Sequence, residues 1–270
     1  MSKHKVVVIT GASSGIGEAA TRLLSQKKGF RVYAGVRNVE RTTPMINVQY
    51  GQLDVTGDAS VIKFIDWVLA EAGRIDVLIN NAGISLLGPV ERTSVEEAQA
   101  LFDTNVFGPL RMIRAALPSM RKAKSGLIIN TSSVVGFLPA PFMGLYAASK
   151  HALEGLSESL DHEIRDFNVR VVLLEPSFTN TKLDTNSKQV REPLGAYGAQ
   201  AETVTKSILA QINAGPPPEV VAKKIIAAIK GPYRMRQPAD GRATLLSLLR
   251  RFVPAQMFDS SLRKSFGLGK

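Results

Sequence analysis

The sequence predicts an α/β fold: a doubly wound parallel sheet with helices on both faces, in a single domain. Short runs of β-branched residues alternate with helical patterns through the first 180 residues. These runs are apolar on both faces, as expected for parallel strands that helices cover on both sides. A glycine-rich turn joins the first run to the first helical pattern, and no linker rich in Gly, Ser or Pro divides the chain.

Six strands are expected, over Lys5–Thr10, Arg31–Gly35, Val48–Gln52, Val77–Asn80, Gly126–Thr131 and Val169–Glu175. Helices are expected over Gly15–Gln26, Ala59–Glu71, Val95–Lys122, Tyr146–Asp166, Ala199–Ala214 and Glu219–Lys230. The connection from Gly35 to Val48 is too short for a full crossover helix and contains Pro44, so it predicts a loop or a short helical turn.

Composition excludes several classes of protein. The 270 residues are 44% hydrophobic, which is enough for a large core. The absence of cysteine excludes disulfides, cysteine metal sites and thiol nucleophiles, and it agrees with a cytoplasmic location. The chain has neither a signal-peptide pattern nor an apolar run of the ~20 residues that a membrane helix needs. The net charge is +11, of which residues 230–270 supply +7.

The turn Thr10–Gly17 follows a predicted strand and opens a predicted helix. Glycines there permit a tight turn, and the helix N-terminus offers free N–H groups to phosphates. The spacing is G-x-x-x-G-x-G rather than the common G-x-G-x-x-G of dinucleotide sites, so a plain strand-to-helix turn is the alternative. The candidate cofactor-binding residues in this turn are Gly11, Ser13, Ser14, Gly15, Ile16 and Gly17.

Further motifs follow in order: Asn80-Asn81-Ala82-Gly83, Asn105, Ser132-Ser133 and Tyr146-x-x-x-Lys150. Together with the glycine-rich turn they resemble the short-chain dehydrogenase/reductase family over about residues 5–181, and the whole chain is similar to its steroid and retinol dehydrogenase branch. The resemblance implies a Rossmann-type sheet of about seven strands. It also implies an oxidoreductase that moves a hydride between a nicotinamide cofactor and a CH–OH or C=O group.

The resemblance makes Tyr146 the general acid/base. Lys150 lies one helical turn later on the same face. A lysine ammonium ~4 Å from the phenolate stabilises it by ~4 kcal/mol at an effective dielectric of ~20, or about 3 pKa units. Such a shift brings the tyrosine near neutral pH. The resemblance also implies reduction of C=O rather than C=C, because enoyl reductases of the same superfamily separate the tyrosine and the lysine by more than four residues.

By the same resemblance, Ser133 is expected to hydrogen-bond and orient the substrate carbonyl, with Ser132 as the rival. Asn105 is expected to hold a water that links Lys150 to solvent. The alternative for Asn105 is a buried amide that bridges two strands, and both roles could hold.

NADP(H) is favoured over NAD(H), which remains the alternative. Val36 occupies the position where an NAD site usually has Asp or Glu, and Arg37 follows it. A charge-assisted bond from arginine to a 2′-phosphate is worth roughly 1.5–3 kcal/mol. Ser13 or Ser14 could add a hydroxyl bond.

By resemblance, Asp54 and Val55 contact the adenine, with a helix cap as the alternative for Asp54. The adenosine ribose is assigned to Asn81, Ala82 and Gly83. The nicotinamide loop begins at Pro176, where Ser177 replaces the family's glycine and puts the loop's backbone angle in question. Its expected cofactor contacts, besides Tyr146 and Lys150, are Pro176, Phe178, Thr179 and Thr181. No metal is expected.

The expected organisation is a cofactor-binding and catalytic core (1–181), a substrate lid (182–215) and a C-terminal helical extension (216–270). Apolar walls at Phe137–Met143 and Ser85–Leu87 predict a small apolar carbonyl or alcohol substrate, with simple packing as the alternative. The resemblance implies that this substrate is steroid-, retinoid- or lipid-like.

Thr244–Val253 combines leucines with Arg250 and Arg251. It predicts either a helix docked on the core or on another subunit, or a peripheral contact with anionic membranes. The resemblance implies a homodimer or homotetramer, because the family commonly pairs its subunits through the long helices near 95–122 and 146–166. The alternatives from other classes are a non-catalytic NADP(H) sensor and a nucleic-acid binder. The intact catalytic set argues against the sensor, and the lack of a nucleic-acid motif argues against the binder.

Overall fold

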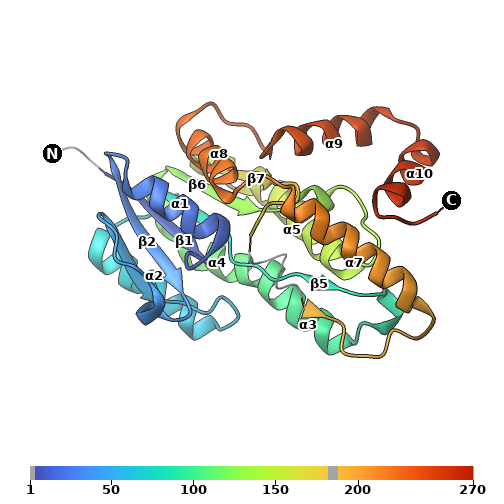
Figure 1. Cartoon of the computed structure of the whole chain (residues 1–270). Coiled ribbons are helices and arrows are strands. Elements are labelled where there is room, and N and C mark those ends of the chain that lie inside the picture. Colours follow the sequence, from blue (N-terminus) through green and yellow to red (C-terminus); the bar gives the residue numbers. More distant parts are fainter. Residues whose placement is uncertain (1–3, 182–187, 270) are drawn as a thin grey trace.

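The computed structural model describes residues 4–181 and 188–269. Its centre is a parallel sheet of seven strands in the order β3-β2-β1-β4-β6-β7-β9 (Figure 1). The strands are β1 Lys5–Thr10, β2 Phe30–Val36, β3 Val48–Gln52, β4 Val77–Asn80, β6 Gly126–Thr131, β7 Val169–Glu175 and β9 Arg236–Pro238. The order reverses between β1 and β4, which opens a crevice at the carboxyl ends of the strands.

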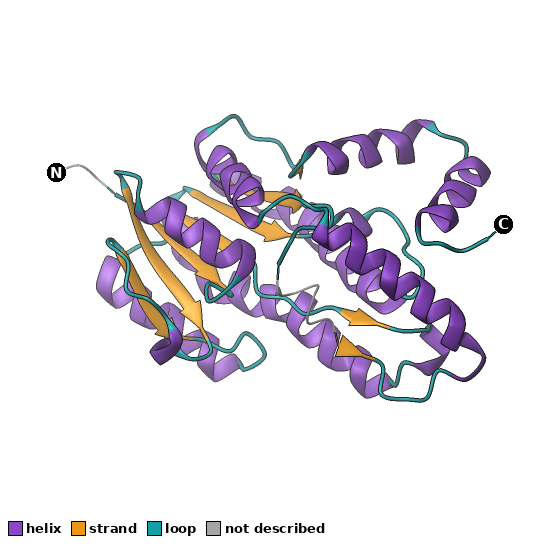
Figure 2. Ribbon diagram, viewed as in Figure 1, coloured by secondary structure: helices purple, strands orange, loops and turns teal. Residues whose placement is uncertain are grey.

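Helices cover both faces of the sheet (Figure 2). On one face lie α1 (Gly15–Ser25) and α8 (Pro218–Lys230), which pack against each other. On the other face lie α2 (Asp58–Ala72), α4 (Gly108–Ala123) and α5 (Gly144–Ile164). The predicted doubly wound single-domain fold is therefore confirmed.

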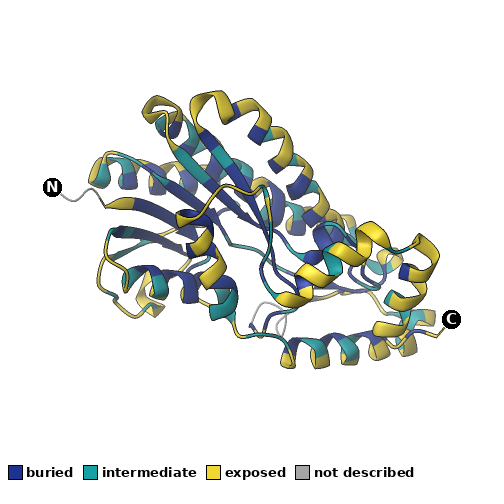
Figure 3. Cartoon of the chain, turned by 90° about the horizontal axis from the view of Figure 1, so that it is seen from above, coloured by how far each residue is buried: buried dark blue, intermediate teal, exposed yellow. Residues whose placement is uncertain are grey.

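Burial along the strands explains why the sequence carried a strong sheet signal. Val7, Val8 and Ile9 are consecutive and fully buried, so both faces of β1 are covered. Figure 3 shows the buried residues gathered on the strands and on the helix faces that meet them. Five of the six predicted strands have the expected bounds, and β2 is one residue longer at each end. The short connection after β2 holds a single 3₁₀ turn, Val39–Arg41, as predicted.

The single helix predicted over 95–122 is wrong. The segment consists of α3 (Val95–Phe102), a π-helical stretch (Asp103–Phe107) and α4. Pro109 explains the irregular turn, because proline has no N–H to donate to the carbonyl of residue 105 and its ring clashes with that carbonyl. The widened turn places Asn105 on the side that faces α5.

The structure adds elements that the sequence did not indicate. The seventh strand, β9, pairs with β7 at the edge of the sheet. A small second sheet pairs β5 (Leu86–Leu87) with β8 (Lys188–Gln189).

Two C-terminal helices lie close to where the sequence predicted them. The helix expected over Ala199–Ala214 is α7 (Gly198–Asn213), and that over Thr244–Val253 is α9 (Gly241–Phe252), which α10 (Ala255–Ser265) follows.

Residues 182–187 of the expected lid lie outside the described residues. Within residues 4–181 and 188–269, no helix combines the length and the apolar character needed to cross a bilayer.

Candidate active site

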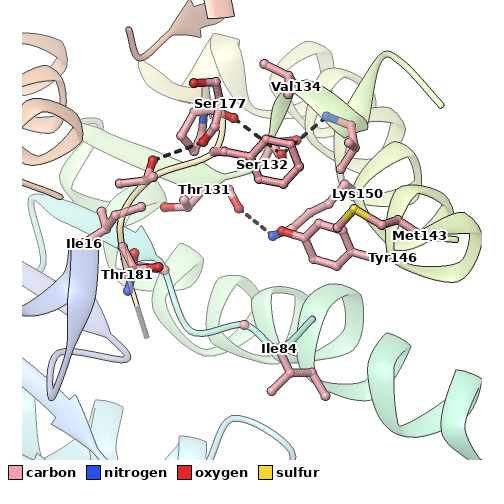
Figure 4. A pocket seen from close by; sticks show the side chains of 17 residues that line it. Ile16, Ile84, Thr131, Ser132, Val134, Met143, Tyr146, Lys150, Ser177 and Thr181 are labelled. Atoms are coloured by element: carbon pink, nitrogen blue, oxygen red, sulfur yellow. Dashed lines mark hydrogen bonds between the residues drawn. The ribbon is translucent and has the colours of Figure 1, made fainter. Parts of the chain in front are cut away.

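The carboxyl edge of the sheet forms a pocket that brings together many of the predicted site residues (Figure 4). From the catalytic set, Ser133, Tyr146 and Lys150 line this pocket. From the predicted cofactor set, it is lined by Ile16, Asn81, Gly83, Pro176, Phe178, Thr179 and Thr181. The other predicted residues are not among those that line it: they lie in the glycine-rich turn, after the ends of β2, β3 and β4, and at Asn105.

Tyr146 and Lys150 project from the first turns of α5 into this pocket, and both are buried. The Lys150 ammonium lies 5.8 Å from the centre of the Tyr146 ring. Its Nζ donates a hydrogen bond of 2.9 Å to the Thr131 carbonyl at the end of β6 (Figure 4). The backbone of the sheet therefore orients the lysine so that its charge stays beside the tyrosine.

Ser132 and Ser133 differ in what their hydroxyls meet. Ser132 is 2% exposed, and its Oγ donates to the Glu154 carboxylate at 2.6 Å. Ser133 is less buried, and its Oγ makes only a long contact of 3.4 Å to the Pro176 carbonyl while accepting from the Val135 N–H at 3.3 Å. The geometry leaves the Ser133 hydroxyl better able to turn toward a substrate oxygen.

Asn105 is fully enclosed and bridges two elements through its side-chain amide. Its Oδ1 accepts from the Ile84 N–H at 2.9 Å. Its Nδ2 donates to the Ile84 carbonyl at 2.9 Å and to the Ser149 hydroxyl at 3.1 Å. The amide thus joins the segment after β4 to α5, rather than two strands. A Cβ on Gly83 would lie 3.3 Å from Asn105 Oδ1 and 3.9 Å from Lys150 Nζ, so these groups converge on one point.

The glycine-rich turn fits a bound pyrophosphate. Gly11 and Gly15 have φ of 66° and 56°, which side chains rarely adopt. A Cβ on Gly17 would lie 2.2 Å from the Gly11 carbonyl oxygen, so only glycine fits there. The N-cap Ser14 makes no side-chain hydrogen bond to the helix, and both Ser13 and Ser14 are exposed. The first N–H groups of α1 therefore face the crevice without a side-chain cap.

The residues predicted to contact the adenosine follow the ends of three strands: Arg37 follows β2, Asp54 and Val55 follow β3, and Asn81 and Ala82 follow β4. Asn81 Nδ2 donates to the carbonyls of residues 10 and 11, and a Cβ on Gly11 would lie 2.8 Å from Ala82 Cα. These contacts fasten the segment after β4 to the glycine-rich turn. Val55 is buried against Gly108.

Asp54 and Arg37 lie close enough to interact. The backbone N–H and the hydroxyl of Thr56 donate to Asp54 Oδ1 at 3.0 and 2.7 Å, and these bonds lower the pKa of the carboxyl. The charge of Arg37 lowers it further. Asp54 therefore stays ionised, and Arg37 is an exposed cation at the end of β2 beside the buried Val36.

The predicted nicotinamide loop crosses from β7 to the glycine-rich turn. A Cβ on Gly15 would lie 3.3 Å from Thr181 Cβ, so the two segments touch. Ser177, which replaces the family's glycine, does not have a positive φ and is held by Asp240. Its N–H and Oγ donate to Asp240 at 2.9 and 3.0 Å. Asp240 also caps α9 through the Ala243 N–H.

Sequence reasoning missed Asp240 as a support of this loop. The signal available was an Asp followed by a helical pattern, which is a common N-cap. That signal predicts the cap of α9 but gives no indication of Ser177.

Apolar side chains close the outer part of the pocket. Val134, Val135 and Met143 line it. They belong to a buried cluster that includes Leu86, Leu87 and residues of α7 and α9. Of the wall predicted at Phe137–Met143, Met143 reaches the pocket and Leu138 packs behind it.

Comparison with known proteins gives a consistent result. Residues 5–192 match the family model described as short chain dehydrogenase. The chain is 38% identical over 204 residues to 3-ketodihydrosphingosine reductase of Bacteroides thetaiotaomicron, covering 76% of this chain and 74% of that protein. It is 33% identical to retinol dehydrogenase 8 of Bos taurus (93% and 86% covered) and 36% identical to 17-beta-hydroxysteroid dehydrogenase type 1 of Mus musculus (87% and 72%).

Solved structures show the same fold with both kinds of nicotinamide cofactor. A short-chain dehydrogenase of Burkholderia cenocepacia in complex with NADP has a TM-score of 0.78 and 26% identity, with 97% of this chain and 98% of that chain covered. A short-chain dehydrogenase/reductase of Burkholderia phymatum in complex with NAD has a TM-score of 0.80 and 26% identity, with 92% and 93% covered.

Proposed function

Because this chain belongs to the short-chain dehydrogenase family and is an oxidoreductase of CH–OH or C=O groups, we propose that it uses NADP(H) to interconvert an apolar carbonyl and its alcohol, with Tyr146 as general acid/base. The observation that carries the proposal is the convergence of Ser133, Tyr146 and Lys150 on one pocket beside the glycine-rich turn. The same convergence argues against a non-catalytic sensor.

In the direction of reduction, each side chain has a separate task. The Ser133 hydroxyl donates to the substrate oxygen and holds the carbonyl in place. Tyr146 then transfers its phenolic proton to that oxygen as negative charge develops there. The Lys150 ammonium, held by the Thr131 carbonyl, stabilises the phenolate that remains. The nicotinamide cofactor supplies the hydride when bound.

Asn105 acts behind these groups. Its amide fixes Ile84 and Ser149, which places the wall of the pocket next to α5. We propose that a water near Gly83, between Asn105 and Lys150, returns the proton from solvent to the lysine and the tyrosine.

Arg37 supports the preference for NADP(H). Val36 brings no carboxylate to the end of β2, so nothing at that position repels a 2′-phosphate. The exposed guanidinium of Arg37 offers the charge that a 2′-phosphate requires, and Ser13 and Ser14 are exposed nearby in the glycine-rich turn. NAD(H) is the alternative cofactor.

The pocket wall and the relatives support an apolar substrate. Val134, Val135 and Met143 offer no charge to a ligand. The similar proteins are named for retinol, a 17-beta-hydroxysteroid and 3-ketodihydrosphingosine, all of which are largely apolar. We propose a steroid-, retinoid- or lipid-like substrate, with residues 182–215 as its lid and residues 216–270 as an extension that completes the pocket.

A peripheral membrane contact through α9 belongs to the same proposal. Leu245, Leu248, Leu249 and Phe252 follow the i, i+3, i+4, i+7 spacing of one helix face and are 54%, 51%, 37% and 72% exposed. Ala243, on the opposite face, is buried on the pocket cluster. α9 contains three arginines and no acidic residue, so anionic lipid complements this outer stripe.

A homodimer or homotetramer and a cytoplasmic location complete the proposal. Val95 of α3 and Phe107 of the π-helical stretch are 66% and 47% exposed, and they offer an apolar surface to a second copy. Two copies of the α9 stripe, in contrast, would bring their arginines together. Sedimentation velocity tests the assembly, and fractionation of the source cells tests the location.

The decisive experiment follows absorbance at 340 nm with NADPH and then NADH against a panel of apolar ketones and aldehydes. We expect turnover with NADPH, and its loss in Tyr146→Phe, because the phenylalanine has no proton to give. Fluorescence titration of NADPH with both proteins controls for binding. NADPH binding with no turnover of any panel member would instead support the sensor.

A further inference from the structure

A buried cluster of charges lies behind the catalytic serine and is not used in the mechanism above. Glu154 of α5 and Glu175 at the end of β7 are 3% and 2% exposed. Arg236 of β9 bonds both carboxylates through Nη1, reaching Glu175 Oε1 at 2.7 Å, and its Nε donates to Glu158 Oε1 at 3.0 Å. Burial and the charge of Glu154 together raise the pKa of Glu175 to about 7, although Arg236 opposes the shift.

Such a cluster is not explained by stability alone. Two carboxylates have been removed from water and placed near each other, which is costly even when a cation pairs with them. Apolar side chains at the same positions would fill the core at a lower cost. Unlike apolar side chains, the charged side chains form directional hydrogen bonds, which fix the relative positions of the segments that they connect.

The first connection runs from Arg236 through Glu154 to the serines. Glu154 follows Lys150 by one helical turn, so it lies on the helix face that carries the catalytic pair. Its Oε1 accepts the hydroxyl of Ser132 at 2.6 Å, while its Oε2 faces Arg236. The fit is close, because a Cβ on Gly136 would lie 2.5 Å from both Glu154 Oε1 and Ser132 Oγ.

The second connection runs from Arg236 through Glu175 to the nicotinamide loop. Glu175 directly precedes Pro176, whose carbonyl accepts from the Val134 N–H at 2.9 Å and from Ser133 Oγ at 3.4 Å. One guanidinium therefore joins the helix of Tyr146, the segment of Ser133 and the start of the loop expected at the cofactor. These three segments must keep their relative positions for hydride transfer.

We propose that Arg236 is a positioning residue for the reaction: through Glu154 and Ser132 it sets where the Ser133 hydroxyl stands relative to Tyr146. Arg236 itself does not line the pocket. This inference rests on the proposed function, because it assigns Arg236 a part in orienting the carbonyl for that reaction.

The main variant is Arg236→Lys, which keeps the charge but replaces the planar fork by a single ammonium. The matched control is Arg170→Lys. Arg170 lies at the other end of β7, where it makes two hydrogen bonds of 3.0 and 2.9 Å to the buried carboxylate of Asp161. Both substitutions weaken an arginine–carboxylate pair with a buried partner, but only Arg236 connects to the serines.

The kinetic test uses NADPH and all-trans-retinal as the probe. We expect kcat to fall about 10- to 100-fold in Arg236→Lys, as displacement of an orienting group does, with the Kd for NADPH unchanged. Arg170→Lys should keep the kcat of the unaltered protein. Equal loss in both variants would reduce Arg236 to a structural role and overturn the proposal.

A double-mutant cycle tests the connection through Ser132. Ser132→Ala removes the hydroxyl that links Glu154 to the segment of Ser133. If the effect of Arg236 passes through Ser132, Arg236→Lys should lower kcat much less in the Ser132→Ala background than in the unaltered protein. Independent, multiplicative effects of the two substitutions would contradict this route.

Hydrogen–deuterium exchange gives a readout that needs no turnover. The N–H groups of Val134 and Val135 bond the Pro176 carbonyl and Ser133 Oγ, so they report the position of the serine segment directly. Faster exchange at these two amides is expected in Arg236→Lys and not in Arg170→Lys. Unchanged exchange would overturn the proposal. If the unaltered protein does not reduce retinal, that failure concerns the proposed substrate class, and the exchange result still decides the role of Arg236.

Discussion

Two neighbouring serines have different surroundings because they alternate along an extended segment at the end of β6. Both serines line the pocket, but the Ser132 hydroxyl donates its hydrogen bond to the buried Glu154 carboxylate, whereas the Ser133 hydroxyl makes only long contacts. Nothing about the two side chains themselves distinguishes them. Sequence spacing favoured Ser133, and the structure adds the physical reason, which is that the proton of Ser132 is already committed to a buried carboxylate.

The proposed preference for NADPH also rests on a single residue, through the positive charge of Arg37. We expect Arg37→Ala to lower kcat/KM for NADPH by about tenfold to a hundredfold and to leave NADH nearly unchanged, because only NADPH carries the 2′-phosphate. The coenzyme ratio is measured at 340 nm with one ketone. The control is Arg41→Ala, an exposed arginine on the following 3₁₀ turn. A similar loss of kcat/KM with both coenzymes would show that Arg37 does not bind the 2′-phosphate of NADPH.

At the scale of the element, α9 has two apolar faces, and only one of them is covered. Ala243 is buried on the pocket cluster and Leu246 packs against it, whereas Leu248 and Phe252 face outward. Arg242 and Arg251 each lie three residues from a leucine of the exposed stripe, and so flank it. In Figure 1, α9 and α10 lie at the side of the molecule away from α2.

The prediction for α9 concerns lipid binding. We expect the protein to sediment with vesicles that contain phosphatidylserine and not with pure phosphatidylcholine, and added salt should weaken the binding. The double substitution Leu248→Ser with Phe252→Ser should abolish it, because it removes half of the apolar stripe. Ile62→Ser serves as the control, since Ile62 is a 55% exposed apolar residue on α2. Binding that survives in the double variant would refute the contact through α9.

At the scale of the whole molecule, stability depends on pH through Glu175. Its pKa is about 7 in the folded protein against an ordinary value of 4.5, because burial disfavours the charged form. Below 4.5 both the folded and the unfolded state hold this proton. Between about 4.5 and 7 only the folded state does, so the free energy of unfolding falls as pH rises. Above 7 the loss is complete and amounts to ~3 kcal/mol.

Glu175→Gln removes this titration. We expect its stability relative to the unaltered protein to increase between about pH 4.5 and 7 and then to stay level, as measured by urea unfolding at a series of pH values. Glu158→Gln is the matched control, because Glu158 bonds the same arginine but its side chain is 47% exposed. A stability difference that does not change with pH would mean that Glu175 is ionised throughout.

Much of the fold could be predicted because its signals are local. The strands β1, β4, β6 and β7 are largely apolar runs whose ends are marked by polar residues or glycines, whereas β3 alternates apolar and polar residues; the bounds of all five agree with the sequence-based ones. The break at Asn105 was missed although Pro109 lay in the sequence, because prolines also occur within helices: Pro118 lies inside α4 without ending it.

The candidate site also contains parts that local sequence determined and parts that it could not indicate. The sequence alone determined the glycine-rich turn before α1, and it determined that Tyr146 and Lys150 share a face of one helix, since both depend on residues within one or two turns. It could not indicate β9, because Arg236–Pro238 has neither an apolar run nor alternation and becomes a strand only by pairing with the edge of β7.

Only the tertiary structure decided which distant residues support the site. Asp240 holds Ser177 across 63 positions of the chain, and Arg236 joins Glu154 and Glu175 across 82 and 61. Hydrogen bonds of this kind depend on the order in which the strands lie side by side, and that order is set by packing of the whole sheet. The physical reason is that the sequence around a charged residue is the same whether its side chain faces water or a buried carboxylate. Only the fold, which sets the burial of that side chain and its partner, distinguishes these two cases.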